Sequence, residues 1–182
     1  MTVPERDGAL SDAELIARWR VGDEAAASAL VHRHARAVAR FLAAAGAGEE
    51  TEDLVQEAFF RAFRKIDTFR GDANFRAWVM RIGSNALKDL RRKHGRRQVL
   101  ALDERDVPDE RFDPHGEAIS RDLEQRLAVE IGRLPEMQRD VFLLRAQQGL
   151  DYAAIAAALD TSVGAARVHY HHAVKRLKQV LE

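Results

Sequence analysis

Apolar residues recur three or four positions apart along most of this 182-residue chain, which is the spacing of helices that bury one face. No stretch supports the alternation with a period of two that marks a half-buried strand. The clearest stripe lies within residues 51–66 and consists of Leu54, Val55, Ala58, Phe59, Ala62, Phe63 and Ile66. The spacing predicts an all-α chain.

Capping signals divide the N-terminal part into four helices. The segment Ser11-Asp-Ala-Glu14 predicts a capping box at the start of the first helix, and Asp23 is the expected N-cap of a longer second one. Thr51 is expected to cap the third helix. A fourth helix should follow the loop of residues 67–74 and end at Gly95, because glycine is common just past a helix C-terminus.

The helical pattern is lost between residues 96 and 120, where Pro108 and Pro114 occur and the charge becomes acidic. We therefore expect two small helical domains joined by a flexible acidic linker. The expected division is a disordered N-terminus over 1–10, a first domain over 11–96, a linker over 97–120 and a second domain over 121–182.

Composition excludes several classes of protein. Cysteine is absent, which excludes disulfides and thiolate zinc sites. The start MTVPERDGAL has no apolar leader core, and no stretch approaches the roughly 18 apolar residues of a membrane span, so we expect a cytoplasmic protein without membrane insertion. No phosphate-binding glycine loop, nucleophile elbow or HExxH motif is visible, so neither catalysis nor a cofactor is expected.

Positive charge is concentrated in one segment of a chain that has 29 basic and 29 acidic residues in total. Residues 61–97 hold twelve Lys or Arg against three Asp, which suits contact with phosphates. Phe69, Phe75, Trp78 and Asn85 surround the loop of residues 70–74, and aromatic faces beside cations suit unstacked bases. Phe75 and Trp78 also fit the buried stripe of the fourth helix, where a place in the core is the simpler explanation.

Residues 151–179 predict a helix-turn-helix, with Asp151 and Ser162 as the two N-caps. The outer face of its second helix carries Gly164, Arg167, Val168, His171, His172, Lys175 and Lys178, a basic face that could enter a major groove. A merely solvated face is the alternative. The spacing of His169 and His172 also allows a metal site, which we do not expect because no carboxylate or thiolate lies nearby in the sequence.

Four motifs in order resemble the extracytoplasmic-function (ECF) sigma factors, the minimal branch of the sigma-70 family. They are Asp53-Leu-Val-Gln56-Glu57-Ala-Phe59, Phe69-Arg-Gly-Asp-Ala-Asn-Phe75-Arg-Ala-Trp78, Arg81-Ile-Gly-Ser-Asn85, and Leu134-Pro135 with Gly149-Leu-Asp-Tyr-Ala-Ala-Ile155-Ala. The resemblance spans nearly the whole chain. It implies a sigma2-like helical bundle followed by a sigma4-like helix-turn-helix domain.

The resemblance also implies partners and site residues. Core RNA polymerase would be bound through its β′ clamp helices and its β subunit, with Asp53, Gln56 and Glu57 in the docking motif; we add Phe60 and Arg64 from the same helix face. We call these five residues the docking face. The acidic linker would thread the RNA-exit path of the polymerase.

Promoter DNA would be read at two elements. At the −10 element, the melting set comprises Phe69, Arg70, Asp72, Asn74 and Asn85 around a flipped base, with Lys88, Arg91 and Arg92 on the adjacent backbone. At the −35 element, the recognition set comprises Arg167, Val168, His171, His172 and Lys175. The family commonly has Ser or Thr at the position of Val168 and Arg at those of His169 and His172, so this chain departs from the pattern.

Two other functions fit the residues. A free-standing transcriptional regulator would bind duplex DNA without polymerase, and a protein-interaction adaptor would use its basic helix only for solvation. Family members are often held inactive by an anti-sigma factor, which would be a further partner. No residue of this chain shows one.

Overall fold

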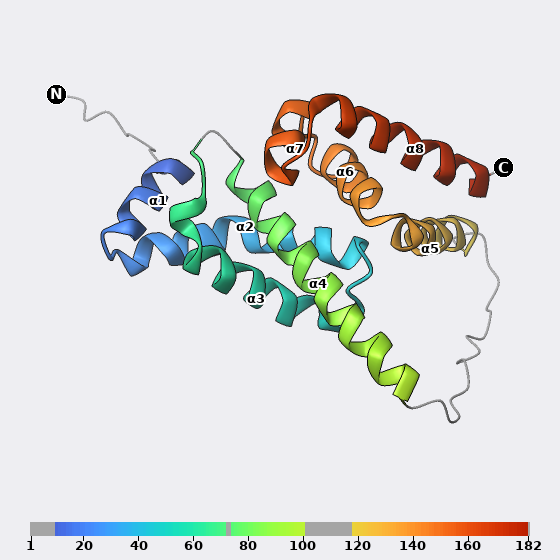
Figure 1. Cartoon of the computed structure of the whole chain (residues 1–182), viewed down its shortest axis with the longest axis horizontal. Helices are drawn as coiled ribbons and strands as arrows, with labels where there is room; N and C mark the ends of the chain where they lie inside the picture. Colours follow the sequence, from blue (N-terminus) through green and yellow to red (C-terminus); the bar gives the residue numbers. More distant parts are fainter. Residues whose placement is uncertain (1–9, 72–73, 101–117, 182) are drawn as a thin grey trace.

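The computed structural model describes residues 10–71, 74–100 and 118–181, and every regular element in these ranges is helical (Figure 1). The all-α prediction is confirmed. The N-terminal half contains α1 (Asp12–Arg20), α2 (Glu24–Ala44), α3 (Thr51–Arg64) and α4 (Phe75–Leu100), with the short 3-10 helices η1 (Gly48–Glu50) and η2 (Ile66–Thr68). The C-terminal half contains α5 (Ala118–Arg133), α6 (Glu136–Ala146), α7 (Tyr152–Leu159) and α8 (Val163–Leu181).

Local signals place most helix starts correctly. The capping box is present: the Ser11 backbone N–H donates to Glu14 Oε2 over 2.7 Å and the Glu14 N–H donates to Ser11 Oγ over 3.3 Å. Asp23 Oδ1 accepts from the backbone amides of Ala25 and Ala26, and Asp151 Oδ1 accepts from that of Ala154. These side chains satisfy amides that a helix leaves without partners at its first turn.

Two predicted boundaries are wrong. Thr51 is the first helical residue of α3 instead of its N-cap, because η1 leads directly into the helix and the Thr51 hydroxyl donates to the Gly48 carbonyl over 2.7 Å. Helix α4 does not end at Gly95 but continues to Leu100, since one glycine costs only about 1 kcal/mol in a helix and the flanking residues are good helix formers. Helix α5 begins at Ala118, three residues before the expected start of the second domain at 121. Residues 101–117, the centre of the expected linker, lie outside the described part, as do residues 1–9.

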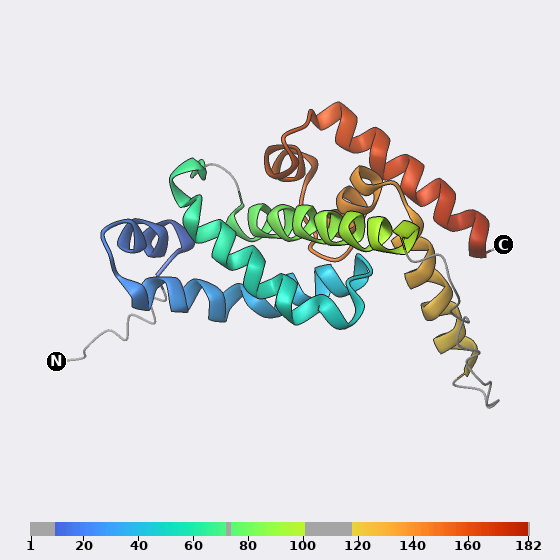
Figure 2. The same ribbon diagram turned by 60° about the horizontal axis from the view of Figure 1, so that its bottom comes forward.

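Helix α4 lies between the two halves of the molecule. Helices α2 and α3 pack against one side of it, and α6 and α7 lie on another (Figure 2). A methyl group added at Gly83 would lie 3.1 Å from a Leu42 side-chain carbon, so α2 and α4 approach closely at this glycine. The position of α4 makes it the structural link between the predicted −10 and −35 readers.

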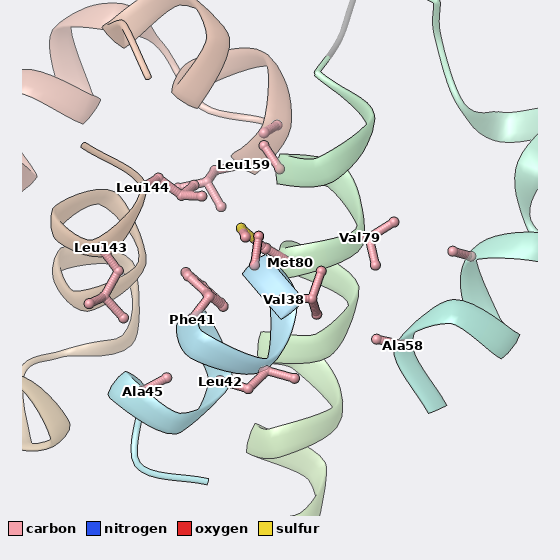
Figure 3. Close-up of a cluster of buried hydrophobic side chains, with 14 of the residues drawn as sticks. Val38, Phe41, Leu42, Ala45, Ala58, Val79, Met80, Leu143, Leu144 and Leu159 are labelled. Carbon is pink, nitrogen blue, oxygen red and sulfur yellow. The ribbon is translucent and has the colours of Figure 1, made fainter. Parts of the chain in front are cut away.

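The apolar core is continuous across the halves. Phe41 of α2 and Met80 of α4 have no exposed surface, and Figure 3 shows them facing Leu144 and Leu159 of the C-terminal half. Burying apolar area in one cluster stabilises the packing of the halves as well as each half by itself.

A buried polar contact completes this interface. The Ser84 hydroxyl of α4 donates to Asp140 Oδ2 of α6 over 2.6 Å, and the two residues are 1% and 5% exposed. Around them, Lys88 pairs with Glu136, and Arg81 donates to the Ala158 carbonyl over 3.2 Å. These contacts join residues more than 45 positions apart and fix how α6 and α7 sit on α4.

Replacing Asp140 by asparagine is expected to stabilise the protein at about pH 8 and to change nothing at about pH 4. Burial raises the pKa of Asp140 from 3.8 to about 6, so the folded protein holds this proton more tightly than the unfolded chain. The contribution of this protonation to the free energy of unfolding is therefore fully present below about pH 4. It is lost as the pH rises through about 6, and the loss amounts to up to about 3 kcal/mol. Thermal unfolding of the wild type and of Asp140→Asn across this pH range measures the difference in stability.

The exposed carboxylate of Asp89 offers the matched control. Asp89→Asn should not reproduce the stabilisation at about pH 8, because the Asp89 carboxylate is exposed to water. A difference between Asp140→Asn and the wild type that does not change with pH would show that the pKa of Asp140 is the same in the folded and the unfolded protein.

Candidate functional site

The outer side of α3 carries the docking face, as its apolar stripe requires. Leu54, Ala58, Phe59 and Ala62 are buried, which leaves Asp53, Gln56 and Arg64 exposed. The Phe60 ring is 58% exposed, and the Arg64 guanidinium lies over it at 5.6 Å from the ring centroid. An exposed aromatic ring among charges is typical of a protein-binding surface.

Arg61 holds Glu57 in place within this surface. Its Nε donates to Glu57 Oε1 over 2.6 Å, and its Nη1 lies 3.5 Å from Asp89 Oδ2 on α4. The hydrogen bond to Glu57 raises the pKa of Arg61. Sequence reasoning missed Arg61, although its position four residues after Glu57 is the spacing of helical ion pairs.

The melting set is brought together only in part. The Phe69 ring is 7% exposed, packs edge-on against Phe75 at 5.6 Å and lies 5.0 Å from Trp78, so it is part of an aromatic cluster instead of an open stacking surface. Asn74 caps α4, because its Oδ1 accepts from the Ala77 amide over 3.0 Å. Asp72 lies outside the described residues.

A cavity of about 350 Å³ lies beside this cluster. Its N-terminal wall consists of Thr68, Phe69, Arg70, Trp78 and Arg81, and its opposite wall of Ala156, Ala157, Asp160 and Thr161 from the C-terminal half. Trp78 and Arg81 thus join Phe69 and Arg70 in one hollow with a basic, aromatic lining. Asn85 does not line it but lies on the same face of α4, seven residues after Trp78, and is exposed.

The three predicted backbone-holding cations have different surroundings. Lys88 pairs with Glu136 of the C-terminal half. Arg91 donates from Nη2 to the Ala45 carbonyl over 2.7 Å and to the Gly46 carbonyl over 3.2 Å, so it satisfies the C-terminal end of α2. Arg92 is exposed on α4. Arg91 is exposed as well, whereas Lys88 is half-buried.

The recognition set lies on the outer face of α8. All five side chains are exposed, and Val168 is 53% exposed, an unusual value for an apolar residue. Arg167 and Arg145 lie over the Tyr152 ring at 5.6 and 5.1 Å. Sequence reasoning missed this stacking, which pre-orients Arg167, because it joins three helices.

A shallow hollow continues the same surface between α6 and α8. Gln138, His172, Lys175, Arg176 and Gln179 line it. Among the side chains that the structure describes, no three of His, Asp or Glu lie close enough together to hold a metal ion. The residues that line the hollow present amide, imidazole and cationic groups, a set that suits phosphate oxygens.

Comparison with known families and proteins finds matches for both halves. The family model described as Sigma-70 region 2 matches residues 29–97, and that described as Sigma-70, region 4 matches residues 124–177. The ECF RNA polymerase sigma-E factor of Haemophilus influenzae is 33% identical over 95% of this chain and 96% of the relative. That of Escherichia coli K12 is 35% identical over 87% of each protein.

Solved structures agree with these matches. CnrH in complex with the cytosolic domain of CnrY superposes with a TM-score of 0.69 at 30% identity, over 93% of this chain and 96% of that one. RpoE of Bartonella quintana in complex with the anti-sigma factor NepR shares the fold, with a TM-score of 0.63 at 23% identity over 83% of this chain and 93% of that one. Helix α1 lies before the first matched region.

Proposed function

Because this chain belongs to the ECF branch of the sigma-70 family and is an RNA polymerase sigma factor, we propose that its three exposed faces divide the work of promoter recognition. Sigma factors bind core RNA polymerase and promoter DNA. The docking face of α3 would bind the polymerase, the start of α4 would capture a −10 base, and α8 would read the −35 element. The observation that supports this division most directly is that α3 and α8 each bury one stripe and leave the predicted residues exposed.

Docking would come first. The acidic and amide groups of Asp53, Gln56 and Glu57 suit the β′ clamp helices, and Phe60 with Arg64 would add an apolar anchor at the edge. The β subunit would contact the C-terminal half, and the acidic segment between α4 and α5 would follow the RNA-exit path.

Strand opening would then depend on base capture. Asn85, Arg70 and the cavity beside Phe69 would hold a base that has left the stack, so that binding energy stabilises the open state. Lys88, Arg91 and Arg92 would hold the adjacent backbone, and Asp72 with Asn74 would shape the loop. Sigma factors are initiation factors and not enzymes; we infer the same for this chain, without catalysis or a cofactor.

At the −35 element α8 would enter the major groove. Arg167 would read a base edge from the orientation that Tyr152 gives it, and His171, His172 and Lys175 would contact neighbouring bases or phosphates. Val168 offers a methyl surface where the family commonly has a hydroxyl, which would favour a thymine methyl group.

Promoter binding would require the halves to separate. The two elements are about 25 base pairs apart, or about 85 Å of B-form DNA. In the structure α6 touches α4 directly through Asp140 and Ser84. Polymerase contacts would replace this interface, and the linker would keep the two readers at a high effective concentration.

Domain limits and regulation follow from the same proposal. The first domain would cover residues 11–96 plus the end of α4, and the second would begin at α5. A cytoplasmic location suits a polymerase subunit, and within the described ranges no helix has the length and apolar character to cross a bilayer. An anti-sigma partner is proposed by analogy with RpoE of Bartonella quintana, whose structure contains the anti-sigma factor NepR.

Run-off transcription tests the function. Purified chain added to core polymerase on a genomic library should yield discrete transcripts that core polymerase alone does not make. Specific retention of duplex DNA by the isolated chain, without such transcripts, would instead support a free-standing regulator. If the chain gives neither discrete transcripts nor retention of duplex DNA, the protein-interaction adaptor is the remaining function.

A further inference from the structure

Helix α1 lies outside the matched sigma-70 regions, but it contacts the first end of the −10 loop directly and the second end through His34 of α2. It has nine residues and is capped at both ends, by the Ser11 box and by the turn at Val21 and Gly22. Leu15 and Ile16 fix it to the core. Its polar residue Arg20 contacts the segment before the loop, and Asp12 contacts α2.

At the first end of the loop, Arg20 binds the backbone that leads into Phe69. Its Nη2 donates to the Ile66 carbonyl over 3.0 Å and to the Phe69 carbonyl over 3.4 Å, and its Nε lies 3.7 Å from Asp67 Oδ1. Within η2 the Ile66 carbonyl also accepts the Phe69 backbone N–H over 3.1 Å, so Arg20 adds a second donor there and ties that turn to the Phe69 carbonyl. One guanidinium therefore holds the start of the loop in a fixed position.

At the second end, Asp12 acts through His34. Asp12 Oδ2 lies 2.8 Å from His34 Nε2, and the imidazole ring lies 5.7 Å from the Phe75 ring, where the loop enters α4. Burial lowers the pKa of His34, so the ring is neutral at pH 7 and its Nε2–H donates to Asp12. Arg33 Nη1 donates to Asp12 Oδ1 over 2.6 Å and keeps the carboxylate in place.

We propose that α1 positions the −10-reading loop, with Arg20 and the Asp12–His34 pair as positioning residues at its two ends. The aromatic contact between Phe69 and Phe75 joins those ends, so both anchors act on one cluster and on the cavity beside it. Neither residue touches DNA in this scheme. The inference depends on the proposed role of the loop in base capture.

The test measures strand opening separately from polymerase binding. Arg20→Met keeps an aliphatic side chain and removes the hydrogen-bond donors. Open-complex formation by the holoenzyme should then fall about tenfold. It is measured with a fluorescent base analogue at the flipped position of a promoter found by run-off transcription. Affinity for core polymerase and helicity should stay unchanged. Arg20→Lys, which retains a cationic donor group without the planar fork, should recover part of the loss. Arg18→Met on the same helix should open DNA normally.

Specificity gives a readout that a purely structural role would not change. In Arg20→Met, discrimination against a substituted base at the flipped position should fall about tenfold, while discrimination at the −35 element is retained. Asp12→Asn should reduce discrimination at the flipped position about threefold. This variant provides the test if Arg20→Met does not fold. Normal opening by both variants, or parallel loss of polymerase affinity and helicity, would overturn the inference. Failure of the wild-type chain to open DNA would instead refute the proposed function.

Discussion

Replacing Gln56 and Glu57 together by alanine should weaken binding to core RNA polymerase about 100-fold or more and leave the chain folded. Few residues carry most of the energy of an interface, and these two lie at the centre of the docking face. Neither belongs to the buried stripe of α3, and the exposed ion pair of Glu57 with Arg61 contributes at most about 1 kcal/mol to stability. Binding of labelled core polymerase gives the affinity, and circular dichroism gives the helicity.

An exposed Glu and an exposed Gln elsewhere provide the matched control. Glu24 begins α2 and Gln147 ends α6, and their joint replacement by alanine removes the same chemical groups from other surfaces. This control should bind polymerase normally. If the docking variant also binds normally, the outer face of α3 is not the docking surface; if it loses helicity, the face has a structural role.

Asn85→Ala should reduce open-complex formation about 10-fold to 100-fold. Loss of a hydrogen bond to a captured base leaves its polar edge unsatisfied, which costs about 1–3 kcal/mol. Binding to core polymerase and to the −35 duplex should be unchanged, because Asn85 is exposed on α4 and belongs to neither the docking face nor the recognition set. Permanganate reactivity of unpaired thymines at the promoter measures the opening.

Asp89→Asn is the neighbouring control, one turn further along the same helix. It removes a negative charge near DNA and should not slow the opening. Asn85→Asp keeps the shape and the acceptor but lacks the amide donors, so it should fail like alanine if the base is read through an N–H group. Wild-type permanganate reactivity in Asn85→Ala would show that the base is held elsewhere.

Local patterns predicted those features that depend on neighbours in the sequence. The capping box at Ser11, the N-cap at Asp151 and the buried stripe of α3 are confirmed, because each is fixed within one or two helical turns. The exposed docking face follows from that stripe. The helix-turn-helix over α7 and α8 follows from the same kind of spacing.

Long-range contacts were beyond such patterns. Ser84 and Asp140 are 56 positions apart, and the burial that gives their hydrogen bond its importance arises only when α6 packs on α4. Arg91 was assigned to DNA from its charge and the family resemblance, whereas the structure also uses it at the end of α2. Phe69 was expected to stack on an unstacked base, but the aromatic cluster of the folded protein buries its ring.

The shared core of the two halves has a consequence for a cleaved molecule. The halves are held together by noncovalent contacts in one buried apolar cluster, which includes Phe41, Met80, Leu144 and Leu159. A protease cut between α4 and α5 would therefore leave two fragments that migrate as one particle. In the proposed scheme, the cut protein would lose function only when polymerase separates the halves, because the severed −35 reader would then dissociate.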